Sequence, residues 1–276
     1  PAFLAYACRG GSQQLPERPP LPVHAQPDVK NPERSNTLEF TSRLDAPAEA
    51  VFDWHARPGA FERLVPPWLP VALERSEGIA EGARAVLRLG VGPAHVKWVA
   101  EHYGVVEGRQ FRDRQLEGPF AHWEHTHRFE PDGPGASLLV DAIEYELPLG
   151  ELGERFGDTL TREALQRQFA YRHRITRNDL ALHRRYNPEG RALRIAVTGA
   201  SGFIGSQLVP FLTTGGHEVL RLVRTRPTGP DEAYWNPREG AVDADRLEGV
   251  DAVIHLAGEN VFALRWTEAK KRRIYE

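Results

Sequence analysis

One short stretch, Arg194–Gly205 (RIAVTGASGFIG), constrains the fold of this chain more than any other. It begins with a run of mostly β-branched, apolar residues, as in a buried strand, and glycines follow at positions 199, 202 and 205. These glycines permit a tight turn, close approach of backbone N–H groups to phosphates, and close packing of the next helix on the strand. The stretch predicts a strand, a turn and a helix N-terminus arranged around a pyrophosphate.

The residues that follow supply the context that such a turn requires. Phe203–Leu212 is amphipathic, glycines 215 and 216 end the predicted helix, and His217–Val223 is a second β-type run. A third run, Asp251–Gly258, completes a β-α-β-loop-β pattern. We therefore expect an α/β domain of Rossmann type that binds NAD(P), beginning at residue 194.

These motifs carry a resemblance to a known family. The glycine motif from Thr198 to Gly205, together with His255–Gly258 (HLAG), resembles the extended and atypical branches of the short-chain dehydrogenase/reductase superfamily. Within it, the chain is similar to epimerase-family proteins of the NAD-dependent epimerase/dehydratase type. The segments that narrow the resemblance are Trp235–Gly240, Leu247–Asp251 and Arg265–Ile274.

The end of the second β-type run indicates which nicotinamide cofactor would fit. An NAD site usually places an acid there for the ribose 2′-hydroxyl, whereas a 2′-phosphate favours a guanidinium. The chain reads Leu222-Val-Arg-Thr-Arg226, and the next acid is Asp231. We therefore predict NADP in preference to NAD, with Arg224 as the first phosphate partner and Arg226 as the second. A solvated arginine loop is the alternative interpretation.

The resemblance and the turn together define the candidate cofactor contacts. His255 is excluded from them, because on a buried parallel strand we expect it to be a packed, hydrogen-bonded side chain. The predicted contacts are Thr198, Gly199, Ser201, Gly202, Phe203, Ile204, Gly205, Arg224, Arg226, Leu256, Ala257 and Gly258.

Catalytic residues are not assigned by the sequence. Redox members of the superfamily generally use a Tyr-x-x-x-Lys pair, in which the lysine lowers the effective pKa of the tyrosine. That pair lies well beyond the third strand, and the last tyrosine here, Tyr275, leaves no room for it. A doubly wound domain needs roughly 150 residues. We expect the chain to stop inside the domain, so that 194–276 is only its N-terminal part, and the reaction type stays open.

Composition excludes several classes of protein. The chain has 276 residues, a net charge of −3 and no apolar run long enough for a membrane span, which requires about 18 residues. Its one cysteine, Cys8, excludes an internal disulfide and favours a reducing cytoplasm. The arginine-rich stretch from Arg162 to Arg194 fits a solvated helix face, so we do not predict nucleic acid binding. A homodimer is left open.

A second unit with a different rhythm precedes the cofactor segment. Residues 1–35 hold seven of the 22 prolines and should be a poorly ordered lead-in, and residues 187–193 should be a linker. Between them, at 36–186, alternating runs predict antiparallel strands and a long helix from about Asp158 to Arg185. The predicted strands are 37–44, 83–89, 95–106, 110–115, 122–129 and 137–147, with a short helix from Pro47 to Trp54.

The order of these elements resembles the START-like helix-grip fold of the polyketide cyclase and lipid-transport superfamily. That α+β fold curls an antiparallel sheet around one helix, and the cavity between them would take a small apolar or aromatic ligand. Weaker matching motifs lie at Arg57–Leu64, Pro66–Trp68, Gly118–Trp123 and Phe169–His173. Together the two units resemble epimerase-family proteins with a START-like domain in front of the Rossmann domain.

Histidines are the most reactive residues of this first unit. Trp123, His125 and His127 should share one strand face, and His102 and His173 could converge on it. A histidine metal site is one interpretation. We favour a cavity wall or a salt-bridged surface, with no metal, because no carboxylate is expected near that face. Asp141, Glu144 and Tyr145 on the next strand could hydrogen-bond a ligand or simply belong to a half-solvated strand.

The functional hypothesis is an NADP-binding epimerase-, dehydratase- or reductase-like protein whose fused domain brings a small molecule to the nicotinamide. Two alternatives remain: a non-catalytic carrier or redox-sensing binding protein, and a cyclase-like activity in the cavity itself.

Overall fold

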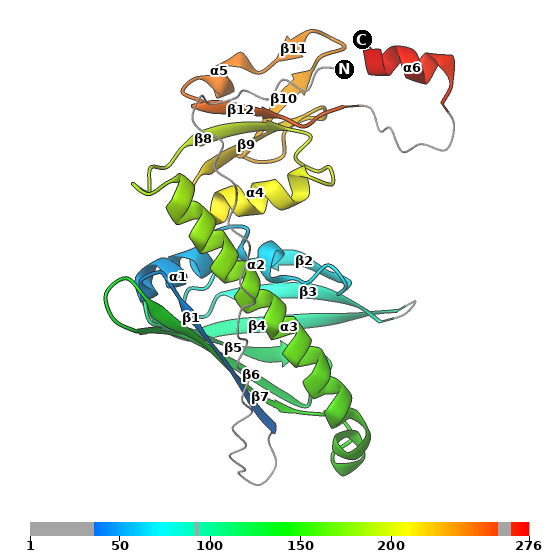
Figure 1. The fold of residues 1–276 in the computed structure, drawn as a ribbon. Coiled ribbons are helices and arrows are strands. Elements are labelled where there is room, and N and C mark those ends of the chain that lie inside the picture. Colours follow the sequence, from blue (N-terminus) through cyan, green and yellow to red (C-terminus); the bar gives the residue numbers. More distant parts are fainter. Residues whose placement is uncertain (1–35, 92–93, 259–265, 276) are drawn as a thin grey trace.

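The structure is a computed structural model that describes residues 36–91, 94–258 and 266–275. The predicted proline-rich lead-in, residues 1–35, lies outside the described residues. The described chain forms two sheets, one of seven strands and one of five, and Figure 1 shows them stacked along the molecule with helix α4 between them.

The first sheet is antiparallel throughout and has the order β1-β7-β6-β5-β4-β3-β2. The predicted strands are present, most of them one or two residues longer than expected. β1 and β7 pair although they lie at opposite ends of the unit, which curls the sheet around its inner face. The strands are β1 (Asn36–Leu44), β2 (Val71–Ser76), β3 (Arg84–Val91), β4 (Ala94–Val106), β5 (Gln110–Glu117), β6 (His122–Pro131) and β7 (Ser137–Glu146).

The sequence did not indicate β2. This strand pairs only with β3, is at most half-buried, and carries Glu74 and Arg75 in its middle. An edge strand with one solvated face needs few apolar residues, so its hydrophobic alternation is weak.

Three helices cover the inner face of this sheet: α1 (Ala48–Ala56), α2 (Ala60–Leu64) and α3 (Glu151–Tyr186). The expected start of the long helix at Asp158 is wrong by seven residues, because α3 begins directly after a turn at Leu149 and Gly150, both of which have positive φ. Gly153 and Gly157 lie in the first turns, and glycine is a weak helix former, so the helical pattern is faint there.

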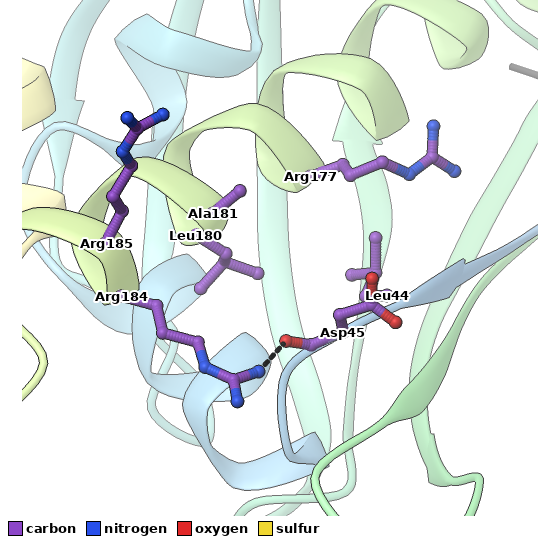
Figure 2. A pocket seen from close by; sticks show the side chains of 7 residues that line it. All are labelled: Leu44, Asp45, Arg177, Leu180, Ala181, Arg184 and Arg185. Carbon is purple, nitrogen blue, oxygen red and sulfur yellow. Dashed lines mark hydrogen bonds between the residues drawn. The ribbon is translucent and has the colours of Figure 1, made fainter. Parts of the chain in front are cut away.

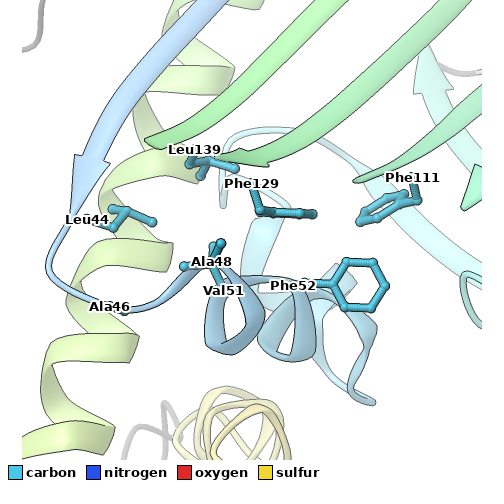
Figure 3. Packing of buried hydrophobic residues seen from close by; sticks show 8 residues of the cluster. All are labelled: Leu44, Ala46, Ala48, Val51, Phe52, Phe111, Phe129 and Leu139. Atoms are coloured by element: carbon cyan, nitrogen blue, oxygen red, sulfur yellow. The ribbon is translucent and has the colours of Figure 1, made fainter. Parts of the chain in front are cut away.

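The core under α1 explains how that helix is fixed. Val51 and Phe52 point from α1 toward the sheet, where they meet Phe111, Phe129 and Leu139, as Figure 3 shows. The rings of Phe52 and Phe129 meet edge to face, with centroids 5.7 Å apart. Such ring pairs add about 0.5–1.5 kcal/mol beyond area burial. The helix therefore closes one end of the curled sheet.

The second sheet has the order β11-β10-β9-β8-β12. Its parallel strands are β8 (Arg194–Thr198), β9 (Glu218–Val223), β10 (Glu232–Asn236) and β12 (Ala252–His255), and β11 (Ala241–Val242) pairs antiparallel with β10. The helices are α4 (Gly205–Thr214), α5 (Ala244–Leu247) and α6 (Glu268–Tyr275). The predicted strand-turn-helix-strand order is confirmed.

The segment expected to be a loop between the second and third strands contains β10, β11 and α5. Its strands are short, and only Ala233 of β10 is buried, so the pattern resembles a turn-rich loop. The tertiary pairing of β10 with β9, at Ala233 and Leu222, makes the strand.

The two sheets are joined through helices. α4 packs on α2, and Gly59, with φ +92°, precedes α2 at the closest approach, where an added Cβ would lie 2.5 Å from Thr213 Oγ1. The His183 ring near the end of α3 stacks on Phe211 of α4 with centroids 4.4 Å apart. The Arg57 guanidinium donates to the Thr214 carbonyl at 3.0 Å. The ring stacking and the hydrogen bond hold the cofactor segment on the helical side of the first unit.

Candidate functional site

The first candidate site is the glycine turn after β8. Gly199 adopts φ +66°, and a Cβ there would lie 2.8–2.9 Å from the backbone of Leu256 and Ala257. Thr198 is buried, and its Oγ1 accepts hydrogen bonds from the N–H groups of Leu256 at 3.0 Å and Ala257 at 3.1 Å. The turn after β8 is thus locked to the end of β12, which brings these predicted contacts together.

The next two glycines bring α4 close to the turn. A Cβ on Gly205 would lie 2.3 Å from the Gly199 carbonyl oxygen, and one on Gly202 would lie 3.1 Å from it. Gly202 N–H donates to that same oxygen at 2.9 Å. Only glycine permits this approach at position 205. The residues between the glycines, Ser201, Phe203 and Ile204, are exposed, with Phe203 at 94%.

This turn meets the physical requirements for a pyrophosphate. The helix dipole favours an anion at the N-terminus of α4, where the N–H groups of Ser206, Gln207 and Leu208 donate to the carbonyls of Gly202 and Ile204. Glycines 199 and 202 keep side chains out of the approach. The residues present therefore fit the pyrophosphate part of a dinucleotide, with Gly258 open on the β12 side, where an added Cβ meets nothing within 4 Å.

The predicted 2′-phosphate partners follow directly after β9. Arg224 and Arg226 are both exposed, and within the described part of the chain neither makes a hydrogen bond or an ion pair. Asp231, the nearest acid along the chain, is held by the Arg221 guanidinium at 2.6 Å. The end of β9 therefore presents free positive charge.

One prediction in this segment needs correction. His255 was expected to be buried on a parallel strand, but β12 is the edge strand among the described ones and His255 is exposed. Its expected hydrogen bonding is confirmed, since Nδ1 lies 2.9 Å from Thr198 Oγ1. The edge position leaves one side of the residue uncovered.

The second candidate site is a cavity of about 710 Å³ between the first sheet and its helices. The cavity that the sequence predicted is thus present. Strands β3 to β6 supply one wall, and α1, α2 and α3 supply residues of the other. Its volume lies in the range typical of small-molecule pockets, about 300–1,000 Å³.

Aromatic and aliphatic side chains form the upper part of this cavity. Trp98 and Trp123 meet edge to face with centroids 5.1 Å apart, and Phe120 packs on both tryptophans. Leu87 and Leu89 of β3 line the same wall, and Leu87 is the cross-strand partner of Trp98. This surface suits an apolar or aromatic molecule.

The floor of the cavity carries a buried polar cluster. Asp141 Oδ1 lies 2.9 Å from His125 Nε2 and 2.7 Å from His127 Nδ1, and its Oδ2 lies 2.7 Å from His173 Nε2. The contact to His127 is short but poorly aligned for a hydrogen bond. Asp141 and the three histidines are each at most 5% exposed.

Asp113 of β5 completes the cluster from the other side. Its Oδ2 lies 3.3 Å from His125 Nδ1 and 3.5 Å from His127 Nε2. Each of these two imidazoles therefore has one nitrogen facing Asp113 and the other facing Asp141. The strand register produces this arrangement, since His125 pairs with Asp113 and His127 pairs with Asp141.

The electrostatics of the cluster are those of a buried charge network. Burial opposes ionisation of Asp141, but the adjacent histidines outweigh it and hold the pKa of that carboxyl well below its usual range. Burial lowers the pKa of His125, and the facing carboxylates of Asp113 and Asp141 outweigh burial, so the net shift is upward. Burial and the charge on His125 lower the pKa of His127. The pKa of His55 falls to about 3, mainly through burial.

This cluster corrects one premise of the sequence analysis. Trp123, His125 and His127 do share a buried face, and His173 converges on it, but the expected lack of a nearby carboxylate is wrong. A signal was available: Asp141 occupies a core-facing position of β7 between Leu139 and Ile143. Acids at core-facing positions are rarely buried without partners. His102 lines the cavity and contacts the Ala83 carbonyl instead.

Glu144 and Tyr145, the other two residues suggested on β7, are not part of the cluster. Tyr145 is fully buried, and its hydroxyl donates to Asp158 at 2.7 Å, while Glu144 is exposed. Of the three, only Asp141 faces the cluster.

A smaller depression of about 380 Å³ lies beside the C-terminal half of α3. Figure 2 shows that Arg177, Arg184 and Arg185 point in different directions around it, and Arg184 donates to the Asp45 carbonyl at 3.0 Å. These guanidinium groups do not converge on one point, so we assign no site there. Among the described helices, none combines the length and apolar character needed to cross a membrane.

The fold and the two sites define a class of protein: a START-like helix-grip domain joined to a Rossmann-type segment. Residues 44–169 match the family described as polyketide cyclase / dehydrase and lipid transport, and residues 195–275 match the NAD dependent epimerase/dehydratase family. The chain therefore joins a domain of the first family to a segment of the second. The second family implies a nicotinamide dinucleotide cofactor.

Known relatives agree with this assignment. The chain is 42% identical over 80 residues to Epimerase family protein Mb2239 of Mycobacterium bovis, an alignment that covers 29% of this chain and 27% of that protein. It is 37% identical over 84 residues to the human Epimerase family protein SDR39U1, covering 30% of this chain and 27% of the human protein.

A solved structure extends the likeness to both units. The nucleoside-diphosphate sugar epimerase from Corynebacterium glutamicum aligns with a TM-score of 0.68 and 33% sequence identity, covering 85% of this chain and 47% of that one. The chain thus spans about a quarter of the length of the two curated relatives and about half of the solved structure.

Proposed function

We propose that the chain supplies the pyrophosphate- and adenosine-binding half of an NADP site in an epimerase-family oxidoreductase, dehydratase or epimerase. The observation that carries the proposal is the close approach of Gly199 and Gly205, which leaves no space for a Cβ beside the turn. When bound, the dinucleotide supplies hydride transfer chemistry. The residues of this chain hold it: backbone N–H groups of the turn would bind the pyrophosphate, and Leu256, Ala257 and Gly258 would border the adenosine.

The choice of NADP rests on charge at the end of β9. Arg224 and Arg226 are exposed, while Asp231, which could favour an unphosphorylated ribose, is engaged by Arg221. A guanidinium can contact a phosphate bidentately, and its charge-assisted hydrogen bonds are worth about 1.5–3 kcal/mol. We therefore assign the 2′-phosphate to Arg224 first and to Arg226 second.

A second part of the proposal concerns the cavity of the first unit. Its volume of about 710 Å³ and its tryptophan and leucine lining support a small apolar or aromatic ligand. In an enzyme this domain would present the molecule to the nicotinamide. The cavity equally supports the second candidate function, a carrier or sensor in which the dinucleotide regulates the ligand. Cyclase-like chemistry in the cavity would need its polar floor. Cytoplasmic location stays a prediction.

Calorimetric titration of the chain with 2′-phospho-ADP-ribose and with ADP-ribose tests the cofactor assignment. We expect the phosphorylated ligand to bind at least about tenfold tighter, and Arg224→Ala to remove most of that preference. Arg238→Ala, an exposed arginine on the turn after β10, is the matched control and should change nothing. Equal affinities of the unmutated chain for the two nucleotides would contradict the NADP assignment.

A separate titration distinguishes the enzyme from the carrier. An apolar ligand that is bound by the chain and consumed on addition of NADPH supports the enzyme. A ligand that is bound, released on addition of NADPH and recovered unchanged supports the carrier.

A further inference from the structure

The floor of the cavity offers more than a wall for an apolar ligand. Two imidazole nitrogens and one carboxylate oxygen, from Asp113, His125 and His127, lie within 4.8 Å of one another. All three residues line the cavity of about 710 Å³. We propose that these three residues hold a divalent transition-metal ion of the zinc class, with the remaining coordination position open to the cavity.

The distances within the triad suit a shared ion. Bonds of about 2.0–2.2 Å in a tetrahedral zinc site place neighbouring ligand atoms about 3.3–3.5 Å apart. Asp113 Oδ2 lies 3.3 Å from His125 Nδ1 and 3.5 Å from His127 Nε2. These separations exceed the usual length of a direct N–H···O hydrogen bond, about 2.7–3.2 Å. They match two edges of a coordination tetrahedron.

The residues behind the triad orient it as metal ligands require. A metal-bound histidine typically directs its other ring nitrogen to a carboxylate or carbonyl, which fixes the tautomer. Here Asp141 lies 2.9 Å from His125 Nε2 and 2.7 Å from His127 Nδ1. His173 holds the other oxygen of Asp141 at 2.7 Å. One buried carboxylate thus hydrogen-bonds to His125 and lies against His127, and the two opposite nitrogens are directed to Asp113.

The backbone makes the triad rigid. Asp113, His125 and His127 belong to adjacent strands in the middle of the seven-stranded sheet, and Asp113 is the direct cross-strand partner of His125. Phe111 stacks on His127 with centroids 4.2 Å apart and limits rotation of that ring. Ligands on paired strands keep their geometry better than ligands on loops.

Charge indicates what would occupy the open position. A dication beside Asp113 and Asp141 is neutralised by their two carboxylates. Of the other charged residues that line the cavity, Arg57 and Glu62 cancel, so Arg172 gives a net charge of one positive unit. An anionic oxygen at the open position would balance it. The cavity ligand is therefore an apolar or aromatic molecule that carries a carboxylate or enolate oxygen, bound with that oxygen at the metal and its rings among Trp98 and Trp123.

Metal titration of the 276-residue chain tests the site directly. The experiment uses a Cys8→Ser background, because Cys8 is the one thiol of the chain. We expect one equivalent of Zn²⁺ with a dissociation constant of about 1 μM or tighter, and Co²⁺ in its place should give visible absorption bands of a four- or five-coordinate site. Added 1-naphthoate should shift those bands.

Variants locate the ion. Asp113→Asn and His127→Gln should each weaken Zn²⁺ binding at least about 100-fold, and Asp141→Asn, which acts through the histidines, about 10–100-fold. His102→Gln is the matched control, because His102 lines the same cavity outside the triad, and it should bind as the parent does. Circular dichroism of each variant separates lost ligation from lost folding.

The parent protein alone can overturn the proposal. A parent chain that takes up less than one equivalent of Zn²⁺ under these conditions, or whose Co²⁺ form lacks visible bands, has no such site, and the cluster is then a charge network only. Equal weakening by His102→Gln would also contradict the assignment. Binding of 2′-phospho-ADP-ribose is measured separately, so failure of the metal site and failure of the cofactor site are distinguishable.

Discussion

The two candidate sites of this molecule are built by opposite means. The glycine turn after β8 works through backbone atoms and the absence of side chains, and its residues lie within one stretch of the sequence. The cavity floor works through buried charged side chains that four elements, β5, β6, β7 and α3, bring together. In the glycine turn, an added side-chain atom is expected to disrupt the site. In the cavity floor, the disruptive change is the loss of one member of a buried charged pair. The predictions below separate these two sensitivities.

The largest effect is expected where a buried partner is lost in the first unit. Arg63 of α2 forms a bidentate pair with Asp179 of α3, at 2.7 and 2.8 Å, and Asp179 is 1% exposed. Arg63→Ala leaves that carboxylate buried and unpaired, which should destabilise the chain by about 3–5 kcal/mol in chemical denaturation. The exposed Arg43 is the control, and Arg43→Ala should leave the stability nearly unchanged.

The next effect is expected where one methyl group is added in the second unit. Gly205→Ala places a Cβ 2.3 Å from the Gly199 carbonyl, and such overpacking should cost about 1–3 kcal/mol in thermal unfolding. Binding of 2′-phospho-ADP-ribose should weaken with it. In Gly258→Ala the added Cβ meets no atom within 4 Å, so stability should be unchanged. Equal stability of the two variants would show that the turn is not closely packed.

A third change tests the cavity without touching the turn. Leu87 lines the cavity from β3, and Leu87→Trp should fill part of it and weaken an apolar fluorescent probe at least about tenfold. Val86→Trp, one position earlier on the opposite face of the strand, should leave probe binding unchanged. Nucleotide affinity should not respond to either variant. Coupled loss of both ligands would contradict the separation of the two sites.

The smallest effect is expected at the junction. Burial is the main reason that the pKa of His183 falls to about 4. Asp179 raises this pKa, whereas the charges of His217, Arg57 and Arg63 lower it. The unfolded chain, with an ordinary histidine pKa near 6.5, therefore takes up a proton that the folded chain refuses between about pH 6.5 and 4. Stability should fall as the pH falls through that window.

His183→Phe keeps the stacking on Phe211 and removes that proton, so the variant should lose less stability between pH 7 and 5 than the parent. Urea unfolding at both pH values measures this difference. The buried His55 contributes equally to parent and variant, so its effect cancels in the comparison. The control is the same substitution at an exposed histidine, His122→Phe. An unchanged pH dependence in His183→Phe would show that this histidine does not limit stability in acid.

The contrast between the sites also explains what could be predicted from the sequence. The turn was found because Gly199, Gly202 and Gly205 lie close together in the sequence, and their spacing after a β-type run is itself a local pattern. The order of strands around the long helix was found for the same reason, since alternation and helical spacing repeat along each element.

The cavity floor could not be found in that way. Asp113 reaches His125 only through the β5–β6 register, and Asp141 reaches His173 only because α3 crosses β7. β10 was likewise missed because its pairing with β9, and not its own composition, makes it a strand. The dinucleotide contacts assigned to Arg224 and Arg226 stay predictions, since they depend on a ligand.

Helix α3 has a mechanical consequence that follows from its length alone. Its 36 residues extend about 54 Å, at 1.5 Å per residue. His173 touches the cavity floor near the middle of this rod, and His183, about 15 Å further along, rests on α4. One continuous helix thus contacts both the floor of the cavity and the helix that follows the nucleotide-binding turn, so it acts as a rigid spacer between the two sites.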